Sequence, residues 1–262
     1  MTFNYLKIIF LFLSVSIFSQ TYHPSDLMFT KDITRAIDLR EKENEPLYST
    51  DREISTLLIN ATLTGTLSPY FSDSLDNGQL LTLSEFRQRI TIEKEEIEKD
   101  TSYMDEDEKE EYLLTLSENS DTDDYFFGKD LYQLEMTETL YFSKKTSEMR
   151  HRIKTLTIFL PADHPENIRG IQQPIATYDF NEIMKVFTND PNAIWYNPKN
   201  DEEHRTLAEA FDLRLFSSYI IKVSNPNDDY LVDIHGGEQQ GIIQATEKEY
   251  EFLEFESNMW EN

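Results

Sequence analysis

Alternation of apolar and polar residues is clearest in the middle of the chain, between residues 125 and 160. The segment LYQLEMTETLYF alternates imperfectly, and RIKTLTIFLP resumes an apolar pattern after the polar stretch SKKTSEM. Two period-two patterns separated by a polar stretch are typical of strands joined by a turn. The sequence therefore predicts an antiparallel β-hairpin in this region.

Helical spacing of apolar residues predicts two helices before residue 70. The first is expected to start at a cap formed by Ser25 or Asp26 and to end before Pro46; its apolar stripe is Leu27, Ile33 and Ile37. The second is expected from about Arg52 to Gly65, after a cap at Asp51 or Thr50; its inward residues are Ile54, Leu57, Leu58 and Ala61.

The second half of the chain mixes both patterns. Short helices are predicted over residues 179–187 and 202–211, and the strands SSYIIKVS and YLVDIHG are expected to pair through the turn NPNDD. Thr246 and Glu249 have the spacing of a capping box, which predicts the start of a last helix. The run DLRLF is expected to join the core, with Asp212 and Arg214 paired at its edge. These elements predict a mixed α+β fold with antiparallel β-hairpins in a single globular domain, residues 21–262.

The first twenty residues have the pattern of a secretory signal peptide. Lys7 precedes an apolar run from Ile8 to Phe18, and small or polar residues follow at Ser19 and Gln20. The apolar run is shorter than the roughly 20 residues that a membrane-spanning helix needs. We therefore expect residues 1–20 to direct export and to be removed.

Charge and cysteine content narrow the possible environments and partners. The chain has 24 basic and 50 acidic residues, a net charge of −26, and no cysteine. Such a charge disfavours nucleic acids and anionic lipids as partners and favours basic proteins and divalent cations. Absence of cysteine excludes disulfides, thiolate sites and the lipid-modified cysteine of lipoproteins.

One segment, residues 93–124, is far more acidic than the rest. It holds fifteen acidic residues against three lysines and has few apolar residues. Low hydrophobicity and high net charge favour a flexible insertion or a solvated acidic helix face.

No catalytic or cofactor motif is present in the sequence. It lacks H-E-x-x-H, G-x-S-x-G, P-loop and G-x-G-x-x-G patterns, and its five histidines do not have metal-ligand spacing. The loop from Asn225 to Asp229 offers oxygen ligands for calcium but lacks the spacing of an EF-hand loop. We therefore predict no catalytic residue, no bound cofactor and no specific metal site.

Candidate interface residues are of two kinds. The hairpin carries the one basic cluster of the chain, whose members Lys144, Lys145, Arg150, Arg152 and Lys154 are suited to an acidic surface on a neighbouring copy. Large aromatic residues at Trp195, Tyr196 and Trp260 are candidate interface anchors. For the tryptophans the alternative is that they fill the protein's own core.

Several blocks resemble one known family in the same order along nearly the whole chain after residue 20. They are DLREKENEPLY (residues 38–48), TSEMRHRIKTLTIFLPA (146–162), DLRLFSSYIIKVSNPNDDYLVDI (212–234) and EYEFLEFESNMWEN (249–262). These blocks resemble the GldN (PorN) family of the Bacteroidetes gliding motility and type IX secretion machinery. Their specificity lies in their combination and order, since none is a catalytic signature.

The resemblance implies a non-enzymatic subunit in the periplasm, held at the inner face of the outer membrane by a partner. It implies a ring of neighbouring copies with a GldK-like lipoprotein (PorK), and contact with the periplasmic part of a GldM-like protein (PorM). Through these partners the GldL–GldM motor would drive secretion and gliding. A near-duplicate, GldO, also exists in this family. Two alternatives from other classes are a stand-alone periplasmic module that binds divalent cations or ligands tolerant of acidic groups, and a hydrolase that uses a carboxylate pair.

Overall fold

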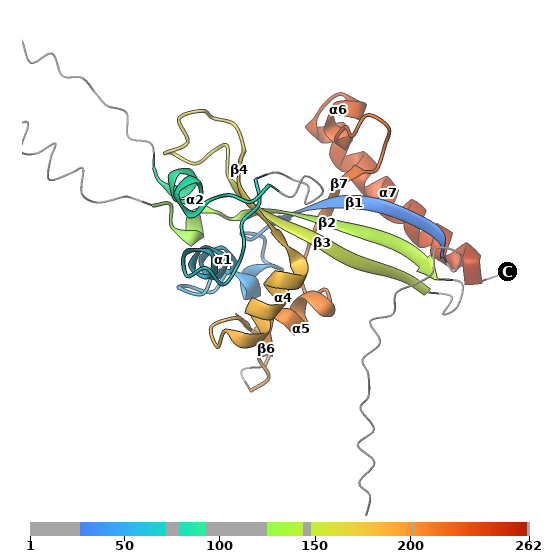
Figure 1. Ribbon diagram of the computed structural model, residues 1–262. Coiled ribbons are helices and arrows are strands. Elements are labelled where there is room, and N and C mark those ends of the chain that lie inside the picture. Colours follow the sequence, from blue (N-terminus) through green and yellow to red (C-terminus); the bar gives the residue numbers. More distant parts are fainter. Residues whose placement is uncertain (1–26, 72–78, 93–124, 144–147, 201, 261–262) are drawn as a thin grey trace, which may run out of the picture.

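The computed structural model describes residues 27–71, 79–92, 125–143, 148–200 and 202–260 (Figure 1). Its framework is a five-stranded antiparallel sheet with the strand order β4-β3-β2-β1-β7. These strands are β1 (Leu27–Asp38), β2 (Gln133–Ser143), β3 (Glu148–Leu160), β4 (Gln173–Asp179) and β7 (Tyr219–Val223). A small second sheet pairs β5 (Ile194–Trp195) with β6 (Arg205–Thr206). The predicted α+β class is confirmed.

Helices surround this sheet. They are α1 (Ile54–Leu63), α2 (Leu83–Ile90), α4 (Phe180–Asn189), α5 (Leu207–Asp212), α6 (Leu231–His235) and α7 (Glu238–Trp260). Two single-turn 3₁₀ helices, η2 (Glu45–Leu47) and η5 (Gly128–Asp130), lie in the connections. No helix in the described part of the chain is both long enough and apolar enough to cross a membrane.

The predicted hairpin is confirmed as β2 and β3. Strand β2 buries every second side chain, beginning with Leu134 and Met136, so one face of the sheet turns toward the core. The pairing shifts by one residue between Thr137 and Glu138, which marks a β-bulge. The turn residues 144–147 lie outside the described residues.

The prediction of a first helix from Ser25 or Asp26 is wrong, because this segment forms β1 in the interior of the sheet. It pairs with β2 on one side and β7 on the other. Ile33 and Ile37 are both fully buried, but their spacing of four residues fits a strand face as well as a helix face. The segment forms a strand because it pairs with two strands that are distant in sequence. A local pattern of residues cannot reveal such partners.

The helices predicted from about Arg52 to Gly65 and over residues 179–187 are confirmed as α1 and α4, whereas the helix predicted over residues 202–211 begins only at Leu207, because Arg205–Thr206 pairs with β5 as β6. In α1 the residues Ile54, Leu57, Leu58 and Ala61 are buried as expected, although the cap is Glu53 and neither Asp51 nor Thr50. Helix α4 begins after Asp179, whose carboxylate accepts a hydrogen bond from the backbone N–H of Asn181 at 2.7 Å. Together with α2 and α5, these helices pack on the sheet to form the main core, centred on Phe86, Leu156, Tyr178, Phe187 and Phe211.

The C-terminal region differs from its prediction in two ways. YLVDIHG does not pair with β7, since it forms α6, which ends at Gly236 in the left-handed conformation (φ 77°) that glycine adopts without strain. Thr246 does not cap the last helix, since α7 starts at Glu238 and the Thr246 hydroxyl bonds to the carbonyl of Ile242 at 3.1 Å. Such a bond to the preceding turn is a common interior role of threonine.

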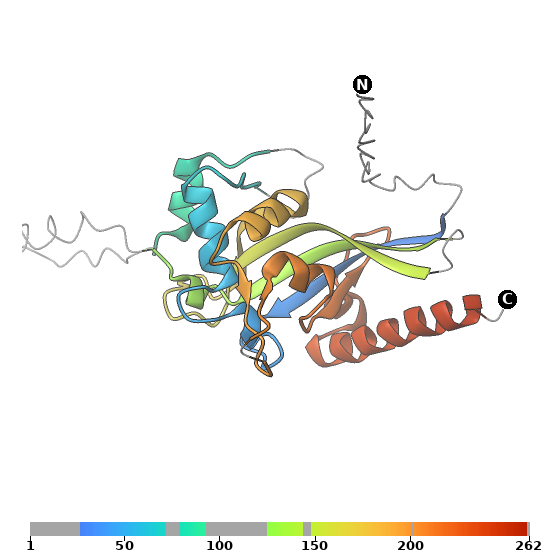
Figure 2. The same cartoon turned by 90° about the horizontal axis from the view of Figure 1, so that it is seen from below.

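Helix α7 closes a second, smaller core away from α1 and α4. It runs beside the sheet toward the end where β2 and β3 are joined (Figure 2). The buried members of this core come from three strands and two helices, β1, β2, β7, α6 and α7: Ile33, Leu140, Ile220, Leu231 and Ala245. Phe29 packs against both Phe252 and Phe255, with ring centroids 5.9 and 4.8 Å apart. One sheet therefore carries two cores on separate stretches of its strands.

Candidate functional site

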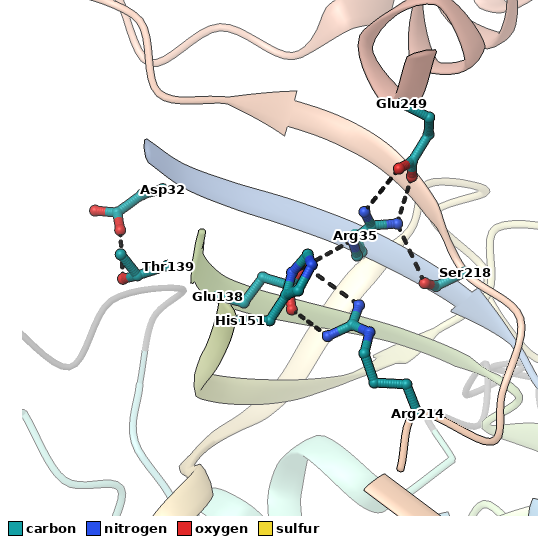
Figure 3. Close-up of polar contacts among 8 residues, drawn as sticks. All are labelled: Asp32, Arg35, Glu138, Thr139, His151, Arg214, Ser218 and Glu249. Atoms are coloured by element: carbon teal, nitrogen blue, oxygen red, sulfur yellow. Dashed lines mark hydrogen bonds and ion pairs between the residues drawn. The ribbon is translucent and has the colours of Figure 1, made fainter. Parts of the chain in front are cut away.

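A buried carboxylate forms the centre of a charged network between the two cores (Figure 3). Glu138 on β2 has no solvent exposure. Its carboxylate accepts hydrogen bonds from Nε of Arg35 at 2.7 Å and from Nη1 of Arg214 at 2.6 Å. Nδ1 of His151, on the paired strand β3, lies 3.1 Å from Oε1. A buried charge with this many partners is compensated within the protein.

Local structure explains how these groups meet. Glu138 lies at the β-bulge and takes the inward position of the alternation between Met136 and Leu140. Arg214 follows the end of α5 with φ at 53°, and its guanidinium reaches the sheet. The expected pair between Asp212 and Arg214 is therefore replaced by a pair between Arg214 and Glu138.

The environment of Glu138 keeps its carboxyl ionised. Burial alone would raise its pKa, but hydrogen bonds from His151 and Arg214, together with the charge of Arg214, lower the pKa to about 2. A carboxyl that is ionised at neutral pH and surrounded by donors does not exchange a proton readily as a general acid. Its chemistry is that of a fixed negative charge that holds cationic side chains in place.

Arg35 links this charge to α7. Its guanidinium binds Glu249 with two contacts, Nη1 to Oε1 at 2.5 Å and Nη2 to Oε2 at 3.0 Å. Arg35 is only 6% exposed. Paired contacts of this kind fix the orientation of both groups. Near the far end of the helix, the backbone N–H of Met149 donates to Glu256 Oε1 at 3.3 Å. Helix α7 is thus attached to the sheet at two polar points as well as by its apolar face.

A pocket of about 350 Å³ lies between α7 and the sheet. Its walls include the network residues Arg35, His151, Arg214 and Glu249, together with Phe252 and Glu256. The charged groups of this wall already bind one another. Among the described residues, no group of three or more His, Asp or Glu side chains is arranged to hold a metal ion.

The three described members of the predicted basic cluster, Arg150, Arg152 and Lys154, lie on one face of the sheet. His151 and Met149 face α7, as their contacts with Glu138 and the smaller core show. Strand alternation places Arg150 and Arg152 on the opposite face, called here the reverse face. Lys154 also lies there, since its Nζ binds Asp32 at 2.9 Å and Asp32 also accepts from Thr139. Lys144 and Lys145 lie outside the described residues.

The three candidate aromatic residues have different settings. Trp195 packs partly buried against the main core, and its indole N–H donates to the carbonyl of Leu215 at 3.1 Å. Tyr196 is 47% exposed and stacks on His204, with ring centroids 4.3 Å apart. Trp260 is the last residue of α7. Tyr196 therefore remains the aromatic candidate with a described exposed surface.

The loop from Asn225 to Asp229, which offered oxygen ligands for calcium, uses its polar groups within the protein. In the loop from Asn225 to Asp229, the Asn225 side chain accepts from two backbone N–H groups, and Asp228 binds Lys222 at 2.8 Å. These oxygens serve the loop itself. The predicted signal peptide (1–20) and the acidic segment (93–124) lie outside the described residues.

Sequence reasoning missed the central network. A signal for it was present at Glu138, a charged residue at an inward position of an otherwise apolar alternation. Its partners Arg35 and Arg214 are 103 and 76 residues away, so no local motif connects them.

Comparison with protein families gives one match over most of the chain. The family described as "Gliding motility associated protein GldN" matches residues 22–261. Comparison with curated proteins gives no match. The match spans both cores and every residue of the charged network.

Proposed function

The chain belongs to the GldN family of gliding motility associated proteins, and from this premise we propose that it is a periplasmic ring subunit of the gliding and type IX secretion machinery. In this proposal it joins a GldK-like (PorK) outer-membrane lipoprotein and neighbouring copies of itself. It also contacts the periplasmic region of a GldM-like (PorM) protein and passes the work of the GldL–GldM motor to secretion. The family match over residues 22–261 is the observation that carries the proposal.

The expected place of action is the periplasm, at the inner face of the outer membrane. The signal-like residues 1–20 support export, and the family match begins directly after them, at residue 22. The sequence has no cysteine to carry a lipid, so a lipoprotein partner is proposed to hold the chain at the membrane.

A structural role without turnover fits the chemistry of the described site. The most buried carboxylate, Glu138, is saturated by donors and has a pKa of about 2. Its contacts serve to position α7 against the sheet. We therefore propose that the protein acts through its surfaces, with Lys144, Lys145, Arg150, Arg152 and Lys154 as subunit contacts and with Tyr196, Trp195 and Trp260 as candidate anchors.

Gene deletion tests this role. We expect a strain that lacks this gene, and any GldO-like second copy, to lose both gliding and secretion of type IX cargo, measured as cargo in the culture medium. Reintroduction of the full chain should restore both. As a matched control, a chain without residues 1–20 should accumulate in the cytoplasm and fail to restore them. Normal secretion in the double deletion would contradict the proposed function.

A further inference from the structure

The side of α7 that faces the sheet packs loosely. Among the residues of this helix whose burial is described, only Gly241 and Ala245 are buried. The same side continues through Glu249, Phe252 and Glu256, which are half-buried and line the pocket of about 350 Å³ between α7 and the sheet. Because α7 covers a cavity with charged walls, the free energy needed to release it is small compared with that of opening the main core.

Two glycines join α6 to α7. Gly236 and Gly237 have φ angles of 77° and 140°, which glycine adopts without strain. A Cβ atom added at either position would meet no atom within 4 Å, so neighbouring groups do not restrict these torsions. Rotation at this point redirects the whole of α7, while α6 stays attached through the buried Leu231. The pair of glycines is therefore suited to act as a hinge.

The surface that α7 covers is specific for this helix. Arg35 binds Glu249 with two contacts, and Phe29 packs on the phenylalanines of α7. Val232 of α6 fits closely against Gly241, where an added Cβ atom would lie 2.6 Å from the valine side chain. A neighbouring copy has the same sequence and offers the same surface. Exchange of α7 between copies therefore preserves the contacts that the helix makes within one chain.

Exposed apolar residues surround the hinge. On α6, Val232 and Ile234 are 38% and 49% exposed, and on α7, Ile242 and Ile243 are 62% and 45% exposed. When α7 crosses to a neighbouring copy, the α6–α7 connections of the two copies lie side by side. These side chains then gain a surface to pack on, and burial of apolar surface is favourable. The exchanged form therefore has a stabilising contribution that the isolated chain lacks.

We infer that neighbouring copies exchange α7. The helix swings out at Gly236 and Gly237 and packs on the sheet of the next copy, where its Glu249 binds that copy's Arg35. Each copy gives one helix and receives one, so the link repeats in one direction and forms a ring when the rotation closes. Proximity within the ring raises the effective concentration of the receiving sheet. This inference rests on the proposed ring function and names the element that links one subunit to the next.

Disulfide trapping tests the exchange on the full chain co-expressed with its GldK-like lipoprotein. Residues 149 and 256 are adjacent across the contact, since the backbone N–H of Met149 donates to Glu256 Oε1 at 3.3 Å. The chain has no native cysteine, so M149C/E256C introduces its only pair. After mild oxidation of the annular complex, we expect a ladder of covalent dimers, trimers and larger species on a denaturing gel without reductant. An annular complex that yields only internally linked monomers would overturn the inference.

Single variants and a matched pair identify the origin of that ladder. When M149C and E256C are on separate co-expressed chains, exchange should give covalent dimers and nothing larger, because each chain has one cysteine. Absence of dimers from this mixture would also overturn the inference. The control is D32C/T139C, whose two exposed positions face each other across β1 and β2 of the same chain. This pair should give internal links only.

A photoreactive side chain gives a second reading without cysteine. Phe255 lies beside Phe29 and Phe142, with ring centroids 4.8 and 6.5 Å away, so benzoylphenylalanine in its place can link to either strand. Irradiation of the complex should join different chains, and linkage confined to single chains would count against the exchange. Failure of the wild-type chain to enter any complex with the lipoprotein would instead contradict the proposed function.

Discussion

Glu138 shows how one residue can determine the arrangement of several elements. It lies fully buried in β2, yet it binds arginines from β1 and from the segment after α5. Removing ions from water is costly, and the cost is offset only when every charge keeps its partners. The network therefore ties the position of the sheet to that of α7 and of the chain after α5.

Replacement of this carboxylate should be strongly destabilising. We expect Glu138→Gln to lower the free energy of unfolding by about 3 to 5 kcal/mol, because it leaves Arg35 without its buried counter-charge. Urea unfolding followed by circular dichroism measures this change. Glu43→Gln, an exposed carboxylate, should change the stability by less than about 0.5 kcal/mol. Equal stability of the two variants would refute the role assigned to Glu138.

The lowered pKa of Glu138 should make the stability of the protein depend on pH. The pKa of Glu138 is lowered from 4.5 to about 2, so its ionised form stabilises the fold above about pH 4.5, and this contribution is lost as the pH falls toward 2. The loss should amount to about 3 kcal/mol at most. Unfolding measured between pH 6 and pH 2.5 should therefore show a smaller pH dependence for Glu138→Gln than for the wild type. Parallel profiles would contradict the assignment.

Helix α7 is held against the sheet by a small number of specific contacts. Much of its surface is exposed, and it is held by Phe252 and Phe255, by the Arg35–Glu249 pair and by the contact of Glu256. Elements with few buried contacts open locally without global unfolding. We therefore expect α7 to separate from the sheet without unfolding of the sheet itself.

Removal of the charge on Glu249 should reveal this local opening. We expect Glu249→Gln to raise the rate of amide hydrogen exchange in α7 by about fivefold or more, the effect of about 1 kcal/mol, while exchange in β2 and β3 changes little. The control is Glu247→Gln, two residues away on the exposed side of the same helix. Unchanged exchange in α7 would show that the Arg35–Glu249 pair does not secure the helix.

Some of the helices and strands could be predicted from the sequence, and others could not. The β2–β3 hairpin, α1 and α4 were predicted because their signals are local: alternation, helical spacing and a capping aspartate. α6 was predicted as a strand, but it forms a short helix that contacts its sequence neighbours β7 and α7. β1 was predicted as a helix because the two strands that pair with it lie far away in sequence. For the same reason the network of Arg35, Glu138 and Arg214 left only one local trace, a charge within the β2 alternation.

At the scale of the whole molecule, the distribution of charge is the feature that bears most on function. The chain is acidic overall, yet the reverse face of its sheet carries Arg150, Arg152 and Lys154, of which Arg150 binds Glu148 and Lys154 binds Asp32. Helix α7 carries the exposed apolar residues Ile242, Ile243 and Tyr250. If the basic cluster forms the proposed subunit contacts, association of copies should weaken as the salt concentration rises, because salt screens the charges of that cluster.

Co-expression with the GldK-like lipoprotein, followed by gentle detergent extraction and negative-stain electron microscopy, tests whether the chain is a ring subunit. We expect a large annular complex that contains both chains. A lone monomer that never co-purifies with the lipoprotein would contradict it. A rise in the melting temperature of that monomer with millimolar calcium would then favour the stand-alone cation-binding module.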